Sequence, residues 1–472
     1  MINNNEKQRP IGLALLTGIA ALMVPVAASA QTATTTASPM APLAGASLAP
    51  YYNDLVNDGI YLSGRYNGEF ATNPSGGIRN GALFTGELSL GAVFDMDKLA
   101  GISGGALHVT ATDRAGNNLA ARDIGNSISV QQIYGQGQTY KLTEFYWDQA
   151  LFGDHLEIQA GRLAAASGFA DASPFNCYFQ TNSVCGNPSI FGFDNQVSYW
   201  ASGVWGGQVT VKPTPDLYAK FGAFAQDPNQ ANSNYHGFNW GENRGIDGAD
   251  ITTELGYTTS FDSDAYPRDF AVGAVFDTAP YSDPYYDTSG NSAVLSGKPY
   301  QTHAGRTTVY GRFDQMIWRP DPQDTRGLYA FGTVALPTDG NQPMDLYLQA
   351  GLLDKGPFAS RPLDTVGFVV TDSQWSDAAL HYVRDSRRSV GGSGMPDANE
   401  VMMEVNYGAQ VSPWLNIMPN LQYIINPDQM NEPTRLTNIP DTFVIGVQFV
   451  IGIPELLGAT TQTYHHTAGS SL

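Results

Sequence analysis

Charged and aromatic polar side chains recur at alternate positions of several apolar segments. Arginine donates hydrogen bonds from a planar fork and an ionised carboxylate only accepts them, so a row of such groups can exchange hydrogen bonds with a hydrated solute. The alternative interpretation is that each of these side chains is only a solvated residue on the polar face of a sheet. The residues that share this alternating position are Arg65, Glu69, Glu87, His108, Glu144, Tyr146, Asp148, Arg312, Asp314 and Glu404.

Catalysis and tight metal binding find little support in the sequence. No histidine lies in a motif with a nucleophile or in metal-ligand spacing, and the lone His465-His466 pair is an incomplete ligand set. The acidic runs Asp262-Ser263-Asp264 and Asp247–Asp250 could bind Ca²⁺ loosely, but neither matches the full pattern of a calcium loop. We therefore expect no catalytic residue, no specific metal site and no cofactor beyond loosely bound Ca²⁺.

The composition indicates a sheet protein that does not bind nucleic acid. The net charge is −20, whereas phosphate binding needs clustered Lys and Arg. The 51 glycines, 11% aromatic residues and only 14% charged residues suit a sheet with one apolar face and many turns.

The N-terminus predicts export. Lys7 and Arg9 precede an apolar run over 11–24, and Ala28-Ser29-Ala30 has the small-x-small pattern of a cleavage site. A retained N-terminal helix is the alternative. No other run approaches the roughly 20 apolar residues of a spanning helix. We expect a signal peptide over 1–30, a partly disordered periplasmic segment over 31–58, strands over 59–453 and a tail over 454–472.

The two cysteines, Cys177 and Cys185, are close in sequence and would be exported together. A local disulfide that braces one loop is expected. A metal site is the weaker alternative, because no histidine lies nearby to complete the ligands.

Strict alternation of apolar and polar residues predicts strands along the whole chain. In the segment 402–427, Met403, Val405 and Tyr407 fall on one face while Glu404 and Asn406 fall on the other. A soluble sandwich and a membrane barrel both produce this pattern. Sixteen such segments are expected, near 60–70, 82–94, 107–112, 144–151, 154–163, 196–212, 216–226, 250–260, 267–278, 302–318, 326–336, 343–353, 364–372, 402–411, 415–425 and 441–453.

The connections between these segments favour the barrel. Long connections, such as 115–138 and 164–195, tend to alternate with short ones, such as Phe152-Gly153 and Ser412-Pro413. Outer-membrane barrels sort their loops in this way, with short periplasmic turns and long outer loops. The fold class is therefore predicted to be all-β, an antiparallel up-and-down barrel of sixteen strands that spans the bacterial outer membrane.

Several stretches resemble the carbohydrate-selective porins of Gram-negative outer membranes, the glucose-porin type. The resemblance runs along nearly all of the mature chain and implies a sixteen-stranded barrel that passes glucose-like sugars. It also implies an inward-folding loop and a constriction lined by charged side chains. It is carried by GIYLSGRYNGEFATNPSGG at 59–77, LEIQAGRLAAASGFADASPFNCYFQ at 156–180, VCGNP at 184–188, FDQMIWRPD at 313–321, DKGPFASRPLDTVGFVV at 354–370 and EVNYGAQVSPWLNIMPNLQYIINP at 404–427.

On this resemblance, the alternating polar residues become pore-lining candidates for sugar contact. Arg162 joins them because it lies in a family-like stretch, although its alternation matches the apolar Ile158 and Ala160. The connection 164–195 is the candidate constriction loop, and an ordinary outer loop with a disulfide brace is the alternative. The chain departs from the family pattern where 454–472 continues beyond the final strand.

The leading hypothesis is passive diffusion of monosaccharides such as glucose, with small oligosaccharides as further solutes. The alternative is a general porin for small hydrophilic solutes and ions without sugar preference. A barrel enzyme and a secreted β-sheet lectin are weaker alternatives. Expected partners are outer-membrane lipid, lipopolysaccharide and the barrel-assembly machinery.

Overall fold

The computed structural model describes residues 47–165, 168–169, 178–181, 188–238 and 245–466. Sixteen antiparallel strands form one closed barrel in which each strand pairs with its sequence neighbours and β1 pairs with β16. The strands are β1 (Ile60–Ser75), β2 (Ala82–Asp95), β3 (Gly105–Gly116), β4 (Tyr140–Leu151), β5 (Leu156–Leu163), β6 (Val204–Thr214), β7 (Leu217–Gln226), β8 (Gly248–Thr258), β9 (Arg268–Asp287), β10 (Tyr300–Trp318), β11 (Gly327–Pro337), β12 (Met344–Lys355), β13 (Thr365–Trp375), β14 (Asn399–Ser412), β15 (Leu415–Ile425) and β16 (Thr442–Gly452).

The predicted strand count and the alternation of faces are confirmed. On β14, Glu404 and Asn406 are buried inside the barrel, while Val405 between them is 45% exposed on the outer face. The outer face carries exposed apolar side chains on many strands, including Phe221, Val272, Phe313, Phe368, Leu421 and Ile445. This apolar belt suits hydrocarbon, and closure leaves no strand edge unpaired within it.

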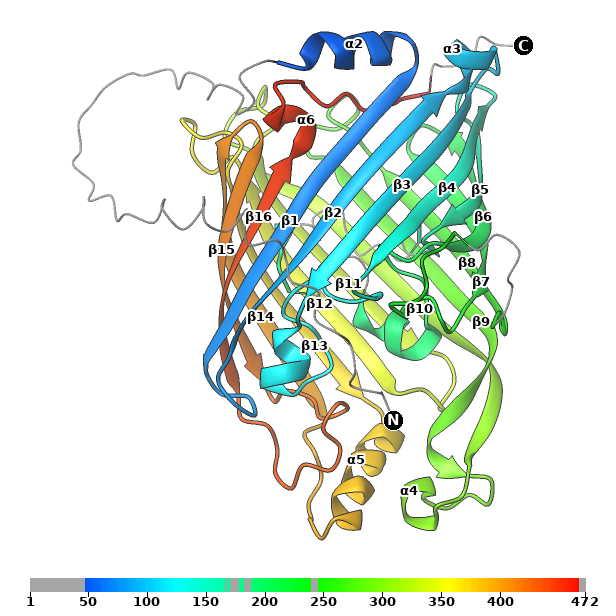
Figure 1. The fold of residues 1–472 in the computed structure, drawn as a ribbon, viewed down its shortest axis with the longest axis vertical. Coiled ribbons are helices and arrows are strands. Elements are labelled where there is room, and N and C mark those ends of the chain that lie inside the picture. Colours follow the sequence, from blue (N-terminus) through cyan, green and yellow to red (C-terminus); the bar gives the residue numbers. More distant parts are fainter. Residues whose placement is uncertain (1–46, 166–167, 170–177, 182–187, 239–244, 467–472) are drawn as a thin grey trace, which may run out of the picture. The chain divides into compact units, whose positions relative to one another are not determined.

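The two ends of the barrel differ in their helices (Figure 1). Helices α2 (Ala49–Asn57), α3 (Met96–Ala100) and α6 (Ile453–Leu456) lie at the end with the short turns, such as residues 413–414 between β14 and β15. Helices α4 (Ala293–Ser296) and α5 (Asp377–Ser389) lie at the other end. In outer-membrane barrels the short turns face the periplasm. The end with α2, α3 and α6 is therefore the periplasmic end, and the end with α4 and α5 is the outer end. Among the described residues, no helix is both long and apolar enough to cross a membrane.

Several strand boundaries shift by a few residues from those expected, and two differ by more. The segment 196–212 was predicted as one strand, but β6 begins only at Val204. Val197 and Ala201 alternate with polar residues because they pack inside the barrel as part of a loop, where each is at most 3% exposed. The connection expected over 279–301 is largely strand, since β9 and β10 continue as a hairpin toward α5. There the Tyr285 hydroxyl donates to Asp385 Oδ2 at 2.8 Å.

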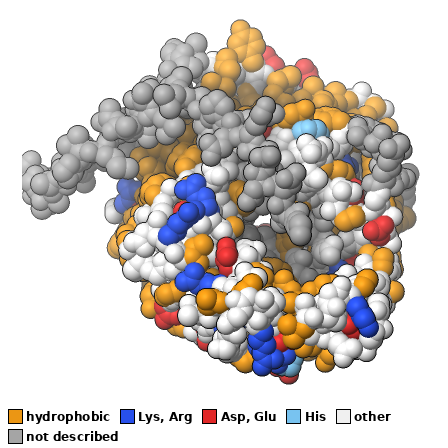
Figure 2. Space-filling view, turned by 60° about the horizontal axis from the view of Figure 1, so that its bottom comes forward, with side chains coloured by type: hydrophobic (Ala, Val, Ile, Leu, Met, Phe, Trp, Pro, Cys, Tyr) orange, Lys and Arg blue, Asp and Glu red, His pale blue; other side chains and the backbone are white. Residues whose placement is uncertain are grey.

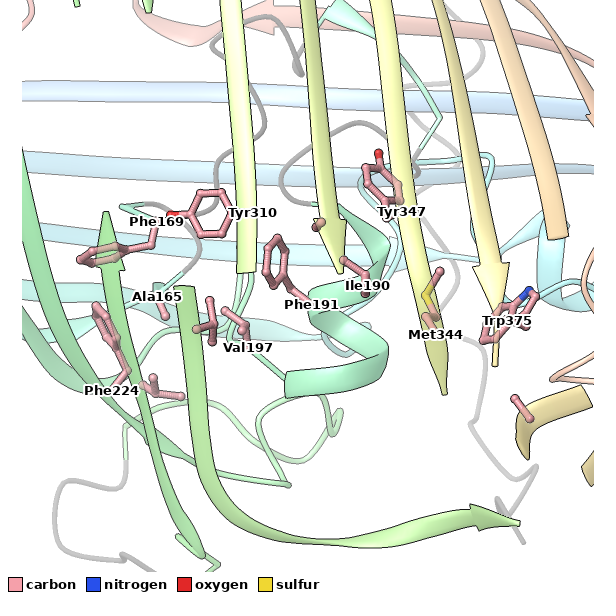
Figure 3. Packing of buried hydrophobic residues seen from close by; sticks show 14 of the residues in the cluster. Ala165, Phe169, Ile190, Phe191, Val197, Phe224, Tyr310, Met344, Tyr347 and Trp375 are labelled. Atoms are coloured by element: carbon pink, nitrogen blue, oxygen red, sulfur yellow. The ribbon is translucent and has the colours of Figure 1, made fainter. Parts of the chain in front are cut away.

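Apolar clusters inside the barrel hold connecting loops against the wall. In the largest, Phe169, Phe191 and Val197 of the β5–β6 connection pack on Phe224 and Tyr310 of the inner wall (Figure 3). In a second, Leu119, Ile124 and Val130 of the β3–β4 connection pack on wall residues of β1, β2 and β14–β16. The inner faces are therefore apolar where a loop covers them, and not polar throughout as the sequence suggested.

Val447 lies on the outer apolar face near the middle of β16, opposite Phe70 of β1. Val447→Arg should impair assembly, because a cation on the lipid face near mid-membrane costs about 2–4 kcal/mol. Heat-modifiable mobility in gel electrophoresis measures the folded fraction, with Val447→Ile as the control. Native-like assembly of the arginine variant would contradict the assigned face.

Candidate permeation pathway

Two connections turn into the lumen, the β3–β4 connection (residues 117–139) and the described parts of the β5–β6 connection (residues 164–203). We call them the inner loops. With its outer end turned forward, the molecule is hollowed near its centre, and a few acidic and basic side chains lie beside the hollow (Figure 2). The inner loops narrow the space that the strands enclose, so the residues that fix them define the pathway.

Glu404 anchors the second inner loop. Its carboxylate accepts hydrogen bonds from the backbone N–H groups of Gln180 at 3.0 Å and Thr181 at 2.7 Å. Asn406 Nδ2 donates to the same carboxylate at 2.8 Å and also to Tyr178 O. Glu404 is only 1% exposed, so this predicted pore residue serves as a loop anchor.

Glu69 anchors the first inner loop in the same way. Its carboxylate accepts from Ile133 N at 3.3 Å and from Gln448 Nε2 at 3.0 Å, while Gln131 Nε2 donates to its backbone carbonyl at 3.0 Å. Glu69 is fully buried. Backbone amides that enter a lumen need acceptors, and a carboxylate on the wall supplies two strong ones.

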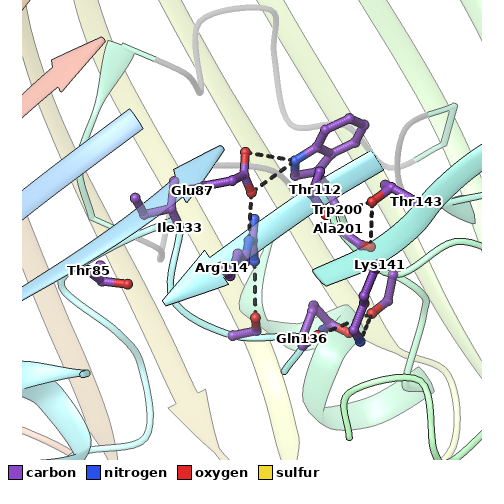
Figure 4. Close-up of polar contacts among 12 residues, drawn as sticks. Thr85, Glu87, Thr112, Arg114, Ile133, Gln136, Lys141, Thr143, Trp200 and Ala201 are labelled. Atoms are coloured by element: carbon purple, nitrogen blue, oxygen red, sulfur yellow. Dashed lines mark hydrogen bonds and ion pairs between the residues drawn. The ribbon is translucent and has the colours of Figure 1, made fainter. Parts of the chain in front are cut away.

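Glu87 joins both inner loops to the wall (Figure 4). Arg114 Nε donates to its carboxylate at 2.6 Å and Trp200 Nε1 donates at 3.1 Å. Arg114 also donates from Nη1 to Gly135 O at 3.1 Å. One buried ion pair of β2 and β3 thus holds residues from both connections.

Arg162 lies near the outer end of β5 and is only 2% exposed. Its Nε donates to Leu142 O at 2.8 Å and its Nη1 donates to the Tyr235 hydroxyl at 3.1 Å. The guanidinium also lies over the Tyr235 ring, 5.1 Å from the centroid. The contact with the β7–β8 connection explains why an arginine is tolerated among apolar neighbours.

Asp314 lies apart from the other candidates. It is 6% exposed and interacts electrostatically with Lys355, whose Nζ lies 5.1 Å from the centroid of the Tyr178 ring. This places Asp314 beside the part of the second inner loop that packs on the wall at Tyr329.

The described lumen contains a polar cavity of about 400 Å³, the lumen cavity. Three of the predicted residues, Glu144, Tyr146 and Arg312, lie on its surface. The lining residues are Glu144, Tyr146, Glu157, Gln159, Leu163, Ala164, Gly168, Gln208, Thr210, Lys212, Tyr218, Lys220, Asp269 and Arg312.

Arg312 is fixed on one side of this cavity by a network of acids and tyrosines. Its Nη2 donates to the Tyr218 hydroxyl at 2.9 Å and lies 3.3 Å from Glu254 Oε1, while Nη1 lies 3.2 Å from Asp269 Oδ1. Lys220 Nζ lies 3.9 Å from Glu254 and donates to Gly168 O at 3.1 Å. The cations of this side are therefore paired and held in place.

On the other side of the cavity, carboxylates accept hydrogen bonds from neighbouring hydroxyl and amide groups. The Thr110 hydroxyl donates to Glu144 Oε2 at 2.7 Å, and Gln159 Nε2 donates to Glu157 Oε1 at 2.9 Å and to Asp148 Oδ2 at 3.3 Å.

Two further predicted residues adjoin this side. The Tyr146 ring stacks on His108 with centroids 4.5 Å apart. Arg65 is exposed and interacts electrostatically with the carboxylates of Glu87 and Glu144.

The sequence prediction omitted several residues of this pathway. Glu254, Lys220 and Asp269 occupy inward positions of predicted strands, so strict alternation could have identified them. Tyr235 lies on a connection without periodic signal, and Trp200 lies in the part of 196–212 that alternates like a strand but folds as a loop.

Two predictions about sites are not tested by the described structure. Cys177 and Cys185 lie outside the described residues, so the disulfide stays a prediction. Among the residues that are described, no group of three His, Cys, Asp or Glu side chains is placed to hold a metal ion. Asp264 instead pairs with Arg268 at 2.7 Å, and Asp250 accepts from Gln226 at 2.7 Å.

Glu404→Ala should release the second inner loop from the wall. It removes the acceptor of two backbone amides and of Asn406, and each buried donor left unpaired costs about 1–3 kcal/mol. We expect larger and noisier single-channel conductance in planar bilayers. Ser412→Ala, on the same face of β14, is the matched control because its hydroxyl has no hydrogen-bond partner among the described residues. Identical traces from both variants would show that Glu404 does not hold the loop.

Comparison with known proteins agrees with this architecture. Residues 79–452 match the carbohydrate-selective porin, OprB family. The chain is 28% identical over 405 residues to Porin B of Pseudomonas aeruginosa, covering 80% of this chain and 86% of that protein. It is 25% identical over 415 residues to the putative porin QuiX of Acinetobacter baylyi, covering 83% and 89% of the two chains. A solved high-pH structure of Pseudomonas putida OprB matches with a TM-score of 0.78 and 26% identity, covering 85% of this chain and 96% of that chain. The predicted family, fold and outer-membrane location are confirmed: the chain belongs to the carbohydrate-selective porin, OprB family.

Proposed function

We propose that this sugar-selective porin passes monosaccharides such as glucose by passive diffusion, and that the lumen cavity is where they are selected. The observation that carries the proposal is the pairing of charges there. The cavity is lined by the acids Glu144, Glu157 and Asp269 and by the cations Lys212, Lys220 and Arg312. The three acids and three cations balance, so the cavity lining carries no excess charge of either sign. A neutral solute can therefore exchange hydrogen bonds with both kinds of group.

The arrangement also suits rapid release of the solute. Arg312, Asp269 and Glu157 already have protein partners, so a hydroxyl can replace one bond and leave without exposing an unpaired charge. Conduction requires sites that are weak enough to leave. Tyr146 and Tyr218 also line the cavity, and aromatic rings suit the apolar side of a sugar.

The general-porin alternative differs in its dependence on solute chemistry. Liposome swelling would compare glucose with an uncharged ethylene glycol oligomer of similar size. Faster entry of glucose supports selection by hydrogen bonding. Equal rates of entry would show that the pathway discriminates by solute size alone.

Arg312→Ala should weaken the preference for glucose, because it removes the donor fork that Tyr218, Glu254 and Asp269 hold in place. We expect less block of ion current by glucose in planar bilayers. Arg312→Lys keeps the charge but not the fork, and should lie between native protein and the alanine variant. Asp269→Asn tests the same site without leaving Glu254 unpaired. Native sugar block in all three would remove Arg312 and Asp269 from the selecting site.

We further propose that the apolar belt contacts outer-membrane lipid and that acidic outer loops meet lipopolysaccharide through loosely bound Ca²⁺. The family and fold are those of channel proteins. We propose that the chain has no catalytic activity of its own and that the barrel-assembly machinery inserts it.

A further inference from the structure

The chain does not stop at the closing strand. After β16 and α6, residues Leu457–His466, here called the exit tail, run along the periplasmic end of the barrel. Leu48 N donates to Leu457 O at 2.9 Å, and Gln462 N donates to the Tyr52 hydroxyl at 3.0 Å. Ala459 is buried against Tyr52 and Val56 of α2. The first half of the exit tail is therefore fixed to the periplasmic helix.

The second half contacts the inner wall. The Tyr464 ring lies 5.5 Å from Tyr61 and 6.3 Å from His108, centroid to centroid. Tyr61 shares its side of β1 with the buried Asn67 and Glu69, and His108 stacks on the cavity residue Tyr146. The exit tail thus reaches the inward side of β1 and β3 at their periplasmic ends.

His466 makes the polar contact that holds this half. Its Nε2 lies 3.1 Å from Asp148 Oδ2, and its Nδ1 lies 3.2 Å from the Tyr464 hydroxyl. Asp148 faces inward on β4 and is 4% exposed. Its Oδ1 has no hydrogen-bond partner in the part of the chain that the structure describes.

The charges around this contact are mostly acidic. Glu157 of β5 and Asp154 of the β4–β5 turn both act on His466 electrostatically. Lys212 lies 3.7 Å from Glu157 and offsets it in part, and His108 Nε2 lies 3.7 Å from Asp148. The hydrogen bond to Asp148 and these acids raise the pKa of His466 above its usual value, although burial opposes the rise.

We infer that the exit tail is a lining element of the pore at its periplasmic exit, and that His466 is a selectivity-determining residue there. Protonated His466 neutralises Asp148, so the exit favours inorganic cations over anions less strongly. Removal or deprotonation of His466 leaves Asp148 and Glu157 as an acidic exit that favours cations. The inference concerns ion selectivity and does not rest on which sugar the pore prefers.

The test is the reversal potential of the full-length protein in planar bilayers under a KCl gradient, between about pH 5.5 and about pH 8, which spans imidazole titration. Native protein should become more cation-selective as the pH rises, because a raised pKa means that the charge is present at low pH and is lost as pH passes through it. His466→Gln should be cation-selective throughout and should change less with pH than native protein, because only His108 then remains as an imidazole beside Asp148. Asp148→Asn should shift the reversal potential in the opposite direction.

His465→Gln is the matched control, because His465 is exposed and adjacent in sequence. A chain that ends at Thr461 keeps Ala459 against α2 but lacks Tyr464 and His466, so it should match His466→Gln in selectivity and show a larger conductance. Heat-modifiable mobility verifies that each variant is assembled. Reversal potentials that are the same in native protein, His466→Gln and the shortened chain would overturn the inference.

Discussion

Closure of the sheet is the constraint on which the rest of the structure depends. Hydrocarbon offers no hydrogen-bond partners, so every strand in the apolar belt must have a neighbour on both sides. The pairing of β1 with β16, from Arg65 opposite Gly452 to Thr72 opposite Ile445, provides the last of these neighbours. Once the ring is closed, the polar positions of each strand can only point inward, and the interior becomes the place where water and solutes pass.

Closure also leaves a wide lumen, which the inner loops narrow. A ring of sixteen strands encloses more space than a small solute needs for selection. Connections that enter this space bring backbone amides that need acceptors. Glu69 and Glu404 accept these amides directly, while Glu87 accepts from Arg114 and Trp200. The wall acids therefore fall into two groups: buried ones that fix the loops, and cavity ones such as Glu144 and Asp269 that remain beside the solute path.

Strands and their faces could be predicted from the sequence because they depend on neighbours two residues apart. Alternation placed Glu404 inside and Val405 outside on β14, and the structure agrees. The same rule extended β6 too far, because Val197 and Ala201 alternate for a different reason, packing within a loop.

The partners of the inward residues could not be predicted from the sequence. Glu404 contacts Gln180, Asp148 contacts His466, and Glu87 contacts Trp200. These pairs are far apart in the chain and have no shared period. Arg162 of β5 shows the same limit, since its partner Tyr235 lies on the β7–β8 connection, far away in the sequence.

The apolar clusters inside the barrel have a consequence for the order in which the molecule loses structure. Phe169, Phe191 and Val197 belong to a connection and are not part of the closed ladder. Local opening follows the boundaries of such units, and each unit has its own free energy. The inner loops can thus come off the wall while all strand pairs remain intact. Mild denaturant should convert the protein into a wide, unselective channel before the barrel itself unfolds, so the loss of solute discrimination would be the first sign of instability.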